Sequence, residues 1–295
     1  MRSTGPLANG AEARKLLVGP DSVCWRTVSD PRLYLGMLYP LLLQVAHPTV
    51  DAGVRDFSDF ERRPWQRLLR TLDYVSLLVY GGEQAIAAGV RLRRLHERFH
   101  GVRPDGRPYH ALEPEAYAWV HATLLQSVVS GHRQFGKPLQ TDELERFYEE
   151  YRGLGALIGV DRHELPDSWR GFGDYFSDLS QTALVPTASV RRVLNAVESA
   201  PPPLKIPGPL WAVLRMPARR ALWLGGVGQL GPALRDRLEI EWSAADRREF
   251  ALLGSAARAI TPLMPGPLRV TGPAQLRLRQ RAIARGPLGG SGAAA

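Results

Sequence analysis

Two histidines, His121 and His132, share one face of a predicted helix that is otherwise apolar. The stretch from Glu113 to Gly136 has proline near its start and glycine at its end, and its large apolar residues recur every three or four positions. An imidazole that stays neutral among apolar walls can bind a haem iron through one ring nitrogen. The commoner alternative is a core histidine with satisfied ring nitrogens, and the spacing alone leaves both interpretations open.

Three further side chains could serve such a site. Arg67 and Arg70 lie on a predicted buried helix, and guanidinium groups pair well with carboxylates such as haem propionates. His47 ends another buried helix because Pro48 follows it. Its imidazole either faces the same pocket or bonds a nearby carbonyl at the helix end, and the sequence does not separate these alternatives.

Several common catalytic motifs are absent from the sequence. It has no Glu-x-x-His pair for a di-iron bundle, no His-Glu-x-x-His zinc motif and no Gly-x-Ser-x-Gly turn. The cluster from Gly225 to Gly228 follows no predicted strand, so a nucleotide-binding loop is disfavoured. These absences leave the histidines as the main candidates for chemistry.

The elements that must position these side chains are all predicted to be helices. Asp30 and Pro31 form a start signal for a buried helix that Pro40 would kink and that ends at His47. A short helical turn and a loop follow it. Later helices are expected over 64–80, 83–100, 114–135, 141–159, 167–184, 189–198, 209–224 and 243–261. No strand pattern persists, so the prediction is an all-α chain of about eight to ten helices.

The length of 295 residues, 44% of them hydrophobic, is enough for one large core. We expect a flexible lead-in over residues 1–20 and a single all-helical domain over 21–265. Residues 266–295 are basic and rich in glycine and alanine, which predicts a partly disordered tail.

The formal net charge is +9, but the arginines are spread along helix faces without interleaved aromatic residues. This pattern disfavours nucleic-acid binding and is compatible with weak association with a membrane surface. Cys24 is the only cysteine, which excludes a disulfide framework and a cysteine-based zinc or iron–sulfur site. An axial thiolate is conceivable, but the sequence favours a small buried residue. The start of the chain lacks an apolar signal core, and the longest apolar run is too short to cross a bilayer. We therefore expect a cytoplasmic protein whose oligomeric state is open.

Four segments in the same order resemble one protein family. They are LLLQVAHPTVDAGVRDFS at 41–58, RLLRT at 67–71, WVHATL at 119–124 and LQTDELERFYEEYRGLGALIGV at 139–160. The chain is similar over about residues 30–185 to the latex-clearing proteins, or rubber oxygenases, and to the ER-bound oxygenase of mycophenolic-acid biosynthesis, the MpaB family. It resembles the small bacterial members most.

The resemblance implies a globin-like multi-helix bundle around a buried haem pocket. It also implies haem b as cofactor, dioxygen as co-substrate, and oxidation of an apolar unsaturated substrate, isoprenoid- or lipid-like, with the help of an electron donor. The family's proximal histidine matches His121. Arg67 and Thr71 match its distal motif, and Arg70 stands where the rubber oxygenases have a lysine. Arginine stays protonated and cannot ligate iron, which puts a lysine-capped state in doubt.

The resemblance also suggests supporting roles. Asp51 is the nearest candidate for the family's proposed base. His132 and Arg152 are expected in the core or beside the haem propionates. Two rivals remain open from the sequence: a haem-binding sensor without turnover, and a helical protein without a cofactor.

Overall fold

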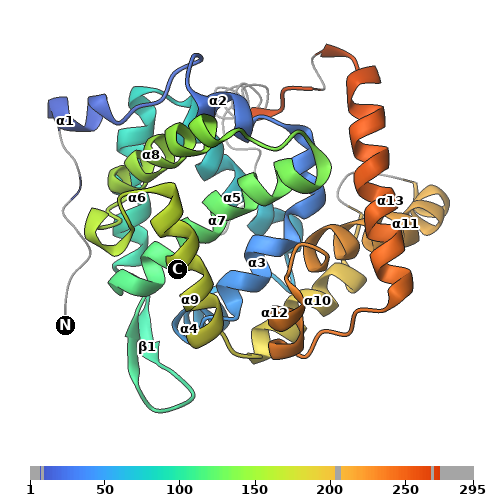
Figure 1. The fold of residues 1–295 in the computed structure, drawn as a ribbon. Coiled ribbons are helices and arrows are strands. Elements are labelled where there is room, and N and C mark those ends of the chain that lie inside the picture. Colours follow the sequence, from blue (N-terminus) through green and yellow to red (C-terminus); the bar gives the residue numbers. More distant parts are fainter. Residues whose placement is uncertain (1–6, 8–9, 203–206, 267–268, 273–295) are drawn as a thin grey trace.

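The computed structural model describes residue 7 and residues 10–202, 207–266 and 269–272. This part of the chain is almost entirely helical, which confirms the all-α prediction (Figure 1). The longer helices are α3 (Leu38–Val45), α4 (Pro48–Phe57), α5 (Pro64–Tyr80), α6 (Glu83–His96), α7 (Pro114–Phe135), α8 (Thr141–Leu157), α9 (Trp169–Thr182), α10 (Ala188–Ser199), α11 (Gly208–Val227) and α13 (Ala244–Ile260). The shorter ones are α1 (Gly10–Lys15), α2 (Val23–Val28), α12 (Pro232–Arg237) and three 3₁₀ helices, η1 (Pro31–Gly36), η2 (Arg162–Glu164) and η3 (Thr261–Leu263).

Helix α7 runs through the middle of the molecule (Figure 1). It contacts η1, α3 and α13 as well as α8. Thirteen of its residues are buried, which fits a helix that is covered on most of its sides. The predicted bounds of α7 are confirmed, because Pro114 begins it and Gly136 follows its last residue.

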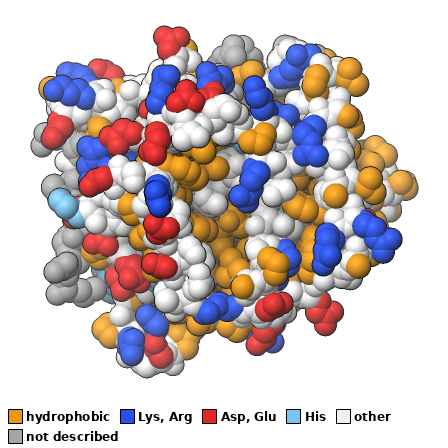
Figure 2. Space-filling view, viewed as in Figure 1, with side chains coloured by type: hydrophobic (Ala, Val, Ile, Leu, Met, Phe, Trp, Pro, Cys, Tyr) orange, Lys and Arg blue, Asp and Glu red, His pale blue; other side chains and the backbone are white. Residues whose placement is uncertain are grey.

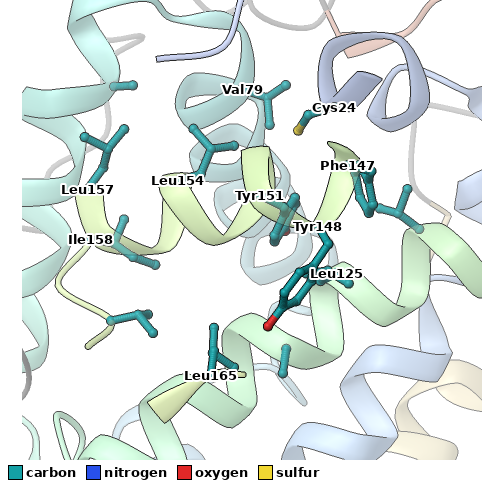
Figure 3. Packing of buried hydrophobic residues seen from close by; sticks show 14 of the residues in the cluster. Cys24, Val79, Leu125, Phe147, Tyr148, Tyr151, Leu154, Leu157, Ile158 and Leu165 are labelled. Carbon is teal, nitrogen blue, oxygen red and sulfur yellow. The ribbon is translucent and has the colours of Figure 1, made fainter. Parts of the chain in front are cut away.

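The buried apolar residues form two clusters. The larger one joins α2, α5, α6, α7 and α8, and the smaller one joins α3, α10 and α11 around Trp119. Figure 3 shows the larger cluster, in which the Cys24 thiol lies among apolar side chains near Val79. Burial, and the charge of Glu150 beside it, raise the pKa of Cys24 well above its ordinary value. Cys24 is therefore a small core residue, as the sequence favoured.

The predicted helix between Asp30 and His47 is divided in two. Asp30 is its N-cap, as predicted, and accepts a hydrogen bond from Arg32 N. The first turns form the 3₁₀ helix η1, and α3 begins only at Leu38. Pro40 then lies in the first turn of α3, where its missing N–H costs nothing. The helix therefore starts again at Leu38, with Pro40 in its first turn, instead of bending at Pro40.

Other differences are local. The segment after His47 is a full helix, α4. His47 is its N-cap, and Pro48 occupies the first helical position, where proline is favoured. The loop before α7 contains a short antiparallel hairpin, β1 (His100–Val102) and β2 (Pro108–His110), that was not predicted. No helix in the described residues is long and apolar enough to cross a membrane. The prediction of a disordered tail falls mostly outside the described residues.

Candidate functional site

His121 lies in the middle of α7 and faces α8. Its exposed fraction is 4%, and its Nε2 atom is 2.9 Å from the backbone oxygen of Tyr151. The rings of His121 and Tyr151 are also in contact, with centroids 4.7 Å apart. The imidazole is thus buried and held from one side by a carbonyl of a neighbouring helix.

Gly155 allows this close approach between α7 and α8. A Cβ atom on Gly155 would lie 2.8 Å from His121 Nε2 and 3.0 Å from Cδ2, closer than non-bonded atoms tolerate. Tyr151 and Gly155 are four residues apart, so they present one face of α8 to the imidazole. A glycine inside a helix is unfavourable by about 1 kcal/mol relative to alanine and usually has a packing reason. Here that reason is the His121 ring.

The environment of His121 keeps its imidazole neutral. Burial lowers its pKa from 6.5 to about 4, although the hydrogen bond to Tyr151 opposes that change. A carbonyl oxygen only accepts hydrogen bonds, so the proton of the neutral ring is on Nε2. The lone pair is then on Nδ1. The backbone thus orients one nitrogen, and the other carries the lone pair that a metal would bind.

His132 has a different set of contacts from His121. Its Nε2 atom is 3.0 Å from the backbone oxygen of Thr27, and its Nδ1 atom is 3.9 Å from a carboxylate oxygen of Asp30. These contacts tie α7 to the connection between α2 and η1. The structure thus separates the two histidines of the stripe, and of the two only His132 lies beside a carboxylate.

Arg67, Arg70 and Thr71 occupy one face of the first half of α5, where both arginines are exposed instead of buried as expected. Arg67 donates a hydrogen bond to Thr71 Oγ1 at 2.5 Å, and Arg70 pairs with Asp59 at 3.2 Å. All of these contacts are local. Among the described contacts none joins the three residues directly to His121.

His96 links these residues indirectly to α7, and nothing in the sequence pattern singled it out. Burial and then the charge of Arg67 lower the pKa of His96 to about 4. Its ring lies edge-on to that of Tyr117, with centroids 5.6 Å apart, and Tyr117 is one turn before His121 on α7. His96 is half-buried, and its Nδ1 atom is buried without a hydrogen-bond partner in the described chain.

His47 and Asp51 lie one turn apart at the start of α4, and both are buried. His47 Nε2 is 3.5 Å from a carboxylate oxygen of Glu115, and this interaction lowers the pKa of Glu115. His47 Nδ1 has no partner in the described residues. Asp51 accepts a hydrogen bond from the backbone N–H of Ser189, in the first turn of α10. Its carboxylate therefore meets the positive end of that helix.

Arg152 lines a cavity of about 680 Å³ between α8, η2 and the start of α9. Its guanidinium group donates hydrogen bonds to the carboxylate of Asp167 and to the backbone oxygen of Arg162. Its Nε atom is buried without a partner in the part of the chain that is described. The residues that line this cavity do not include His121, so Arg152 and His121 do not share one pocket wall.

The chain is 28% identical over 238 residues to uncharacterized proteins of Mycobacterium bovis and Mycobacterium tuberculosis, covering 78% of this chain and 90% of each relative. No solved structure matches the chain. A family model described as "ER-bound oxygenase mpaB/B'/Rubber oxygenase, catalytic domain" matches residues 25–259, well beyond the segments on which the resemblance rested. Because that match spans most of the sequence, the chain belongs to the family of MpaB-type and rubber oxygenase catalytic domains.

Proposed function

We propose that this protein is a haem b-dependent oxidoreductase that uses dioxygen to oxidise an apolar, unsaturated substrate of the isoprenoid or lipid kind. Family membership supports the oxygenase class. The observation that carries the cofactor proposal is the buried, neutral imidazole of His121, oriented by Tyr151. The globin-like arrangement and the haem pocket are part of this proposal.

The residues around His121 fit a haem iron in their chemistry. Metal-binding histidines commonly donate the N–H of one ring nitrogen to a backbone carbonyl, which fixes the tautomer and leaves the other nitrogen for the metal. The contact between His121 Nε2 and Tyr151 O has this form. A pKa of about 4 also means that no proton competes for the lone pair near neutral pH. In this tautomer Nδ1 is the nitrogen available to iron.

The chain's own residues would bind and orient the reactants. Haem, when bound, supplies the redox chemistry, and the protein supplies its position and polarity. Arg67 and Arg70 are permanent cations that would hold propionates or shape the distal side with Thr71, whose hydroxyl already contacts Arg67. Arg70 would not ligate iron, because a guanidinium group has no free lone pair. Neighbours of His121 on α7, such as Tyr117 and Leu125, belong to the larger apolar core and would exclude water.

The supporting residues keep the roles that the resemblance gave them, as proposals. Asp51 remains the candidate base, although its carboxylate contacts α10. His47, with an unpartnered nitrogen, remains the other candidate near the start of α7. Arg152 and His132 remain candidates for propionate contacts, and an electron donor completes the proposed cycle.

The experiment is turnover by the purified protein after expression with a haem precursor. Isoprenoid and fatty-acid alkenes are incubated with the protein, dioxygen and a reductant, while oxygen uptake and carbonyl products are measured. Oxygen-dependent product from a haem-loaded sample supports the proposal. Normal haem content without product from any alkene would favour a haem sensor, and a colourless preparation would favour a helical protein without cofactor.

A further inference from the structure

The first half of α11 is a helix with almost no protein around it. From Gly208 to Ala218 every residue except Trp211 is exposed. The exposed set includes large apolar side chains, with exposed fractions of 50% for Leu210, 71% for Val213, 41% for Leu214 and 64% for Met216. An apolar surface of this kind needs an explanation, because scattered single residues are normal but a contiguous group is not.

The second half of the same helix is firmly fixed. Leu224 and Val227 are buried, and a Cβ atom on Gly225 would lie 2.0 Å from the backbone oxygen of Leu35. Pro217 lies between the two halves and removes one backbone hydrogen bond from the helix. The buried second half of α11 therefore holds the exposed first half in place. In Figure 1 the start of α11 lies at the right edge of the molecule.

The neighbouring helix α13 and the turn η3 after it also carry exposed apolar side chains. Helix α13 packs against α11, and it and η3 carry Leu252, Ile260 and Leu263 with exposed fractions of 68%, 57% and 81%. We call these three residues, together with Leu210, Val213, Leu214 and Met216, the α11–α13 apolar face. In Figure 2 apolar and basic side chains alternate along this right-hand edge.

The exposed half of α11 carries charges of one sign, whereas α13 also carries Asp246 and Glu249, which both pair with Arg220 on the second half of α11. The sequence contains no aspartate or glutamate over residues 208–227 or 250–272, whereas both stretches contain arginines. Arg215 is exposed and has no ion-pair partner among the described residues. Two copies of this face would set arginine against arginine, whereas anionic headgroups would complement it.

We propose that the α11–α13 apolar face docks onto an anionic lipid surface. The first half of α11 would lie in the plane of the interface, with Leu210, Val213 and Leu214 on one helical face directed into it. Arginines beside that face would meet the headgroups, each contributing about fivefold in affinity. The proposal is independent of the haem assignment, because it rests on surface residues alone.

Docking would also bring lipid close to the helix that carries Arg67. The segment before α11 is joined to the start of α5 by a hydrogen bond of 2.6 Å from Trp65 Nε1 to Pro201 O. A substrate dissolved in the bilayer would therefore be presented at the side of the protein where Arg67 and Thr71 lie.

The test is flotation of the full chain with phosphatidylcholine vesicles, with or without phosphatidylglycerol. We expect binding that requires phosphatidylglycerol and weakens as salt is raised. Val213→Asp should lower the vesicle affinity about tenfold, since it loses apolar burial and adds a negative charge. Val102→Asp on the hairpin is the matched control, because Val102 is exposed to 60% and lies outside the α11–α13 apolar face; this variant should bind like the wild type.

A second readout locates the contact. Cys24 is fully buried, so a single Val213→Cys variant can be labelled selectively with a polarity-sensitive dye. Its emission should shift to the blue on anionic vesicles, and a dye on Val102→Cys should not respond. No flotation, or equal flotation of the Val213→Asp variant, would overturn the proposal. Concentration-dependent dimerisation that Val213→Asp abolishes, without vesicle binding, would assign the face to a second copy instead.

Discussion

Replacing Gly155 with alanine tests the packing that orients His121. The new Cβ atom would lie 2.8 Å from Nε2, whereas ordinary contacts begin at 3.4 Å, so the ring must retreat by about 0.6 Å (3.4 − 2.8). The hydrogen bond to Tyr151, 2.9 Å long in the wild type, would then stretch toward the limit of a hydrogen bond. The change therefore affects both the packing and the orientation of the imidazole.

The expected cost follows from three contributions. Overpacking of a core costs about 1–3 kcal/mol, and a weakened hydrogen bond costs about 1 kcal/mol. Alanine recovers about 1 kcal/mol as a better helix former. We expect Gly155→Ala to lower the free energy of unfolding by about 2 kcal/mol, measured by urea denaturation followed by circular dichroism.

Gly173→Ala is the matched control. Gly173 also lies inside a helix, α9, but a Cβ atom there would meet nothing within 4 Å. That variant should gain up to about 1 kcal/mol, because only the helix-propensity term remains. If Gly155→Ala proved as stabilising as Gly173→Ala, the close contact between α8 and His121 would be wrong.

The remaining predictions concern two buried titratable groups. Burial holds the pKa of His121 near 4 in the folded protein, so the unfolded chain takes up a proton at a higher pH than the folded one. The free energy of unfolding should therefore fall as pH drops from about 6.5 to about 4, and this group should contribute about 3 kcal/mol to the fall. His121→Gln should flatten that decline in a pH series of urea titrations, leaving the part due to His96, and an unchanged slope would refute the assignment. Asp51→Asn should cost about 1 kcal/mol, because its carboxylate loses a charge-assisted contact with the start of α10; an unchanged melting curve would show that this contact contributes nothing.

The helices with clear sequence signals were predictable. Helices α5 and α7 each have proline at the start and glycine just after the end, and both have the predicted bounds. Helix α4 was predicted as only a short helical turn, because His47-Pro48 was interpreted mainly as the end of the preceding helix. The same dipeptide places an extended residue before a proline, which is also the way a helix begins.

The site was predictable only as far as the identity of His121. Its orienting partner, the carbonyl of Tyr151, is 30 residues away in the sequence. Every residue has a backbone carbonyl, so the sequence does not show which one accepts the hydrogen bond. Gly155 was a usable signal, because a glycine inside a clearly predicted helix usually has a packing or functional role. His96 could not be found from its neighbours, because its burial depends on how α5 and α6 pack together rather than on its own helix.

The most direct measurement is the haem content of three purified proteins: the wild type, His121→Ala and His132→Ala. His132 is the matched control because it is a buried histidine of the same helix with a backbone carbonyl partner. The account predicts a Soret absorption band in the wild type and in His132→Ala, and its loss or marked weakening in His121→Ala. Equal haem content in His121→Ala and the wild type, or a wild type that binds no haem, would contradict it.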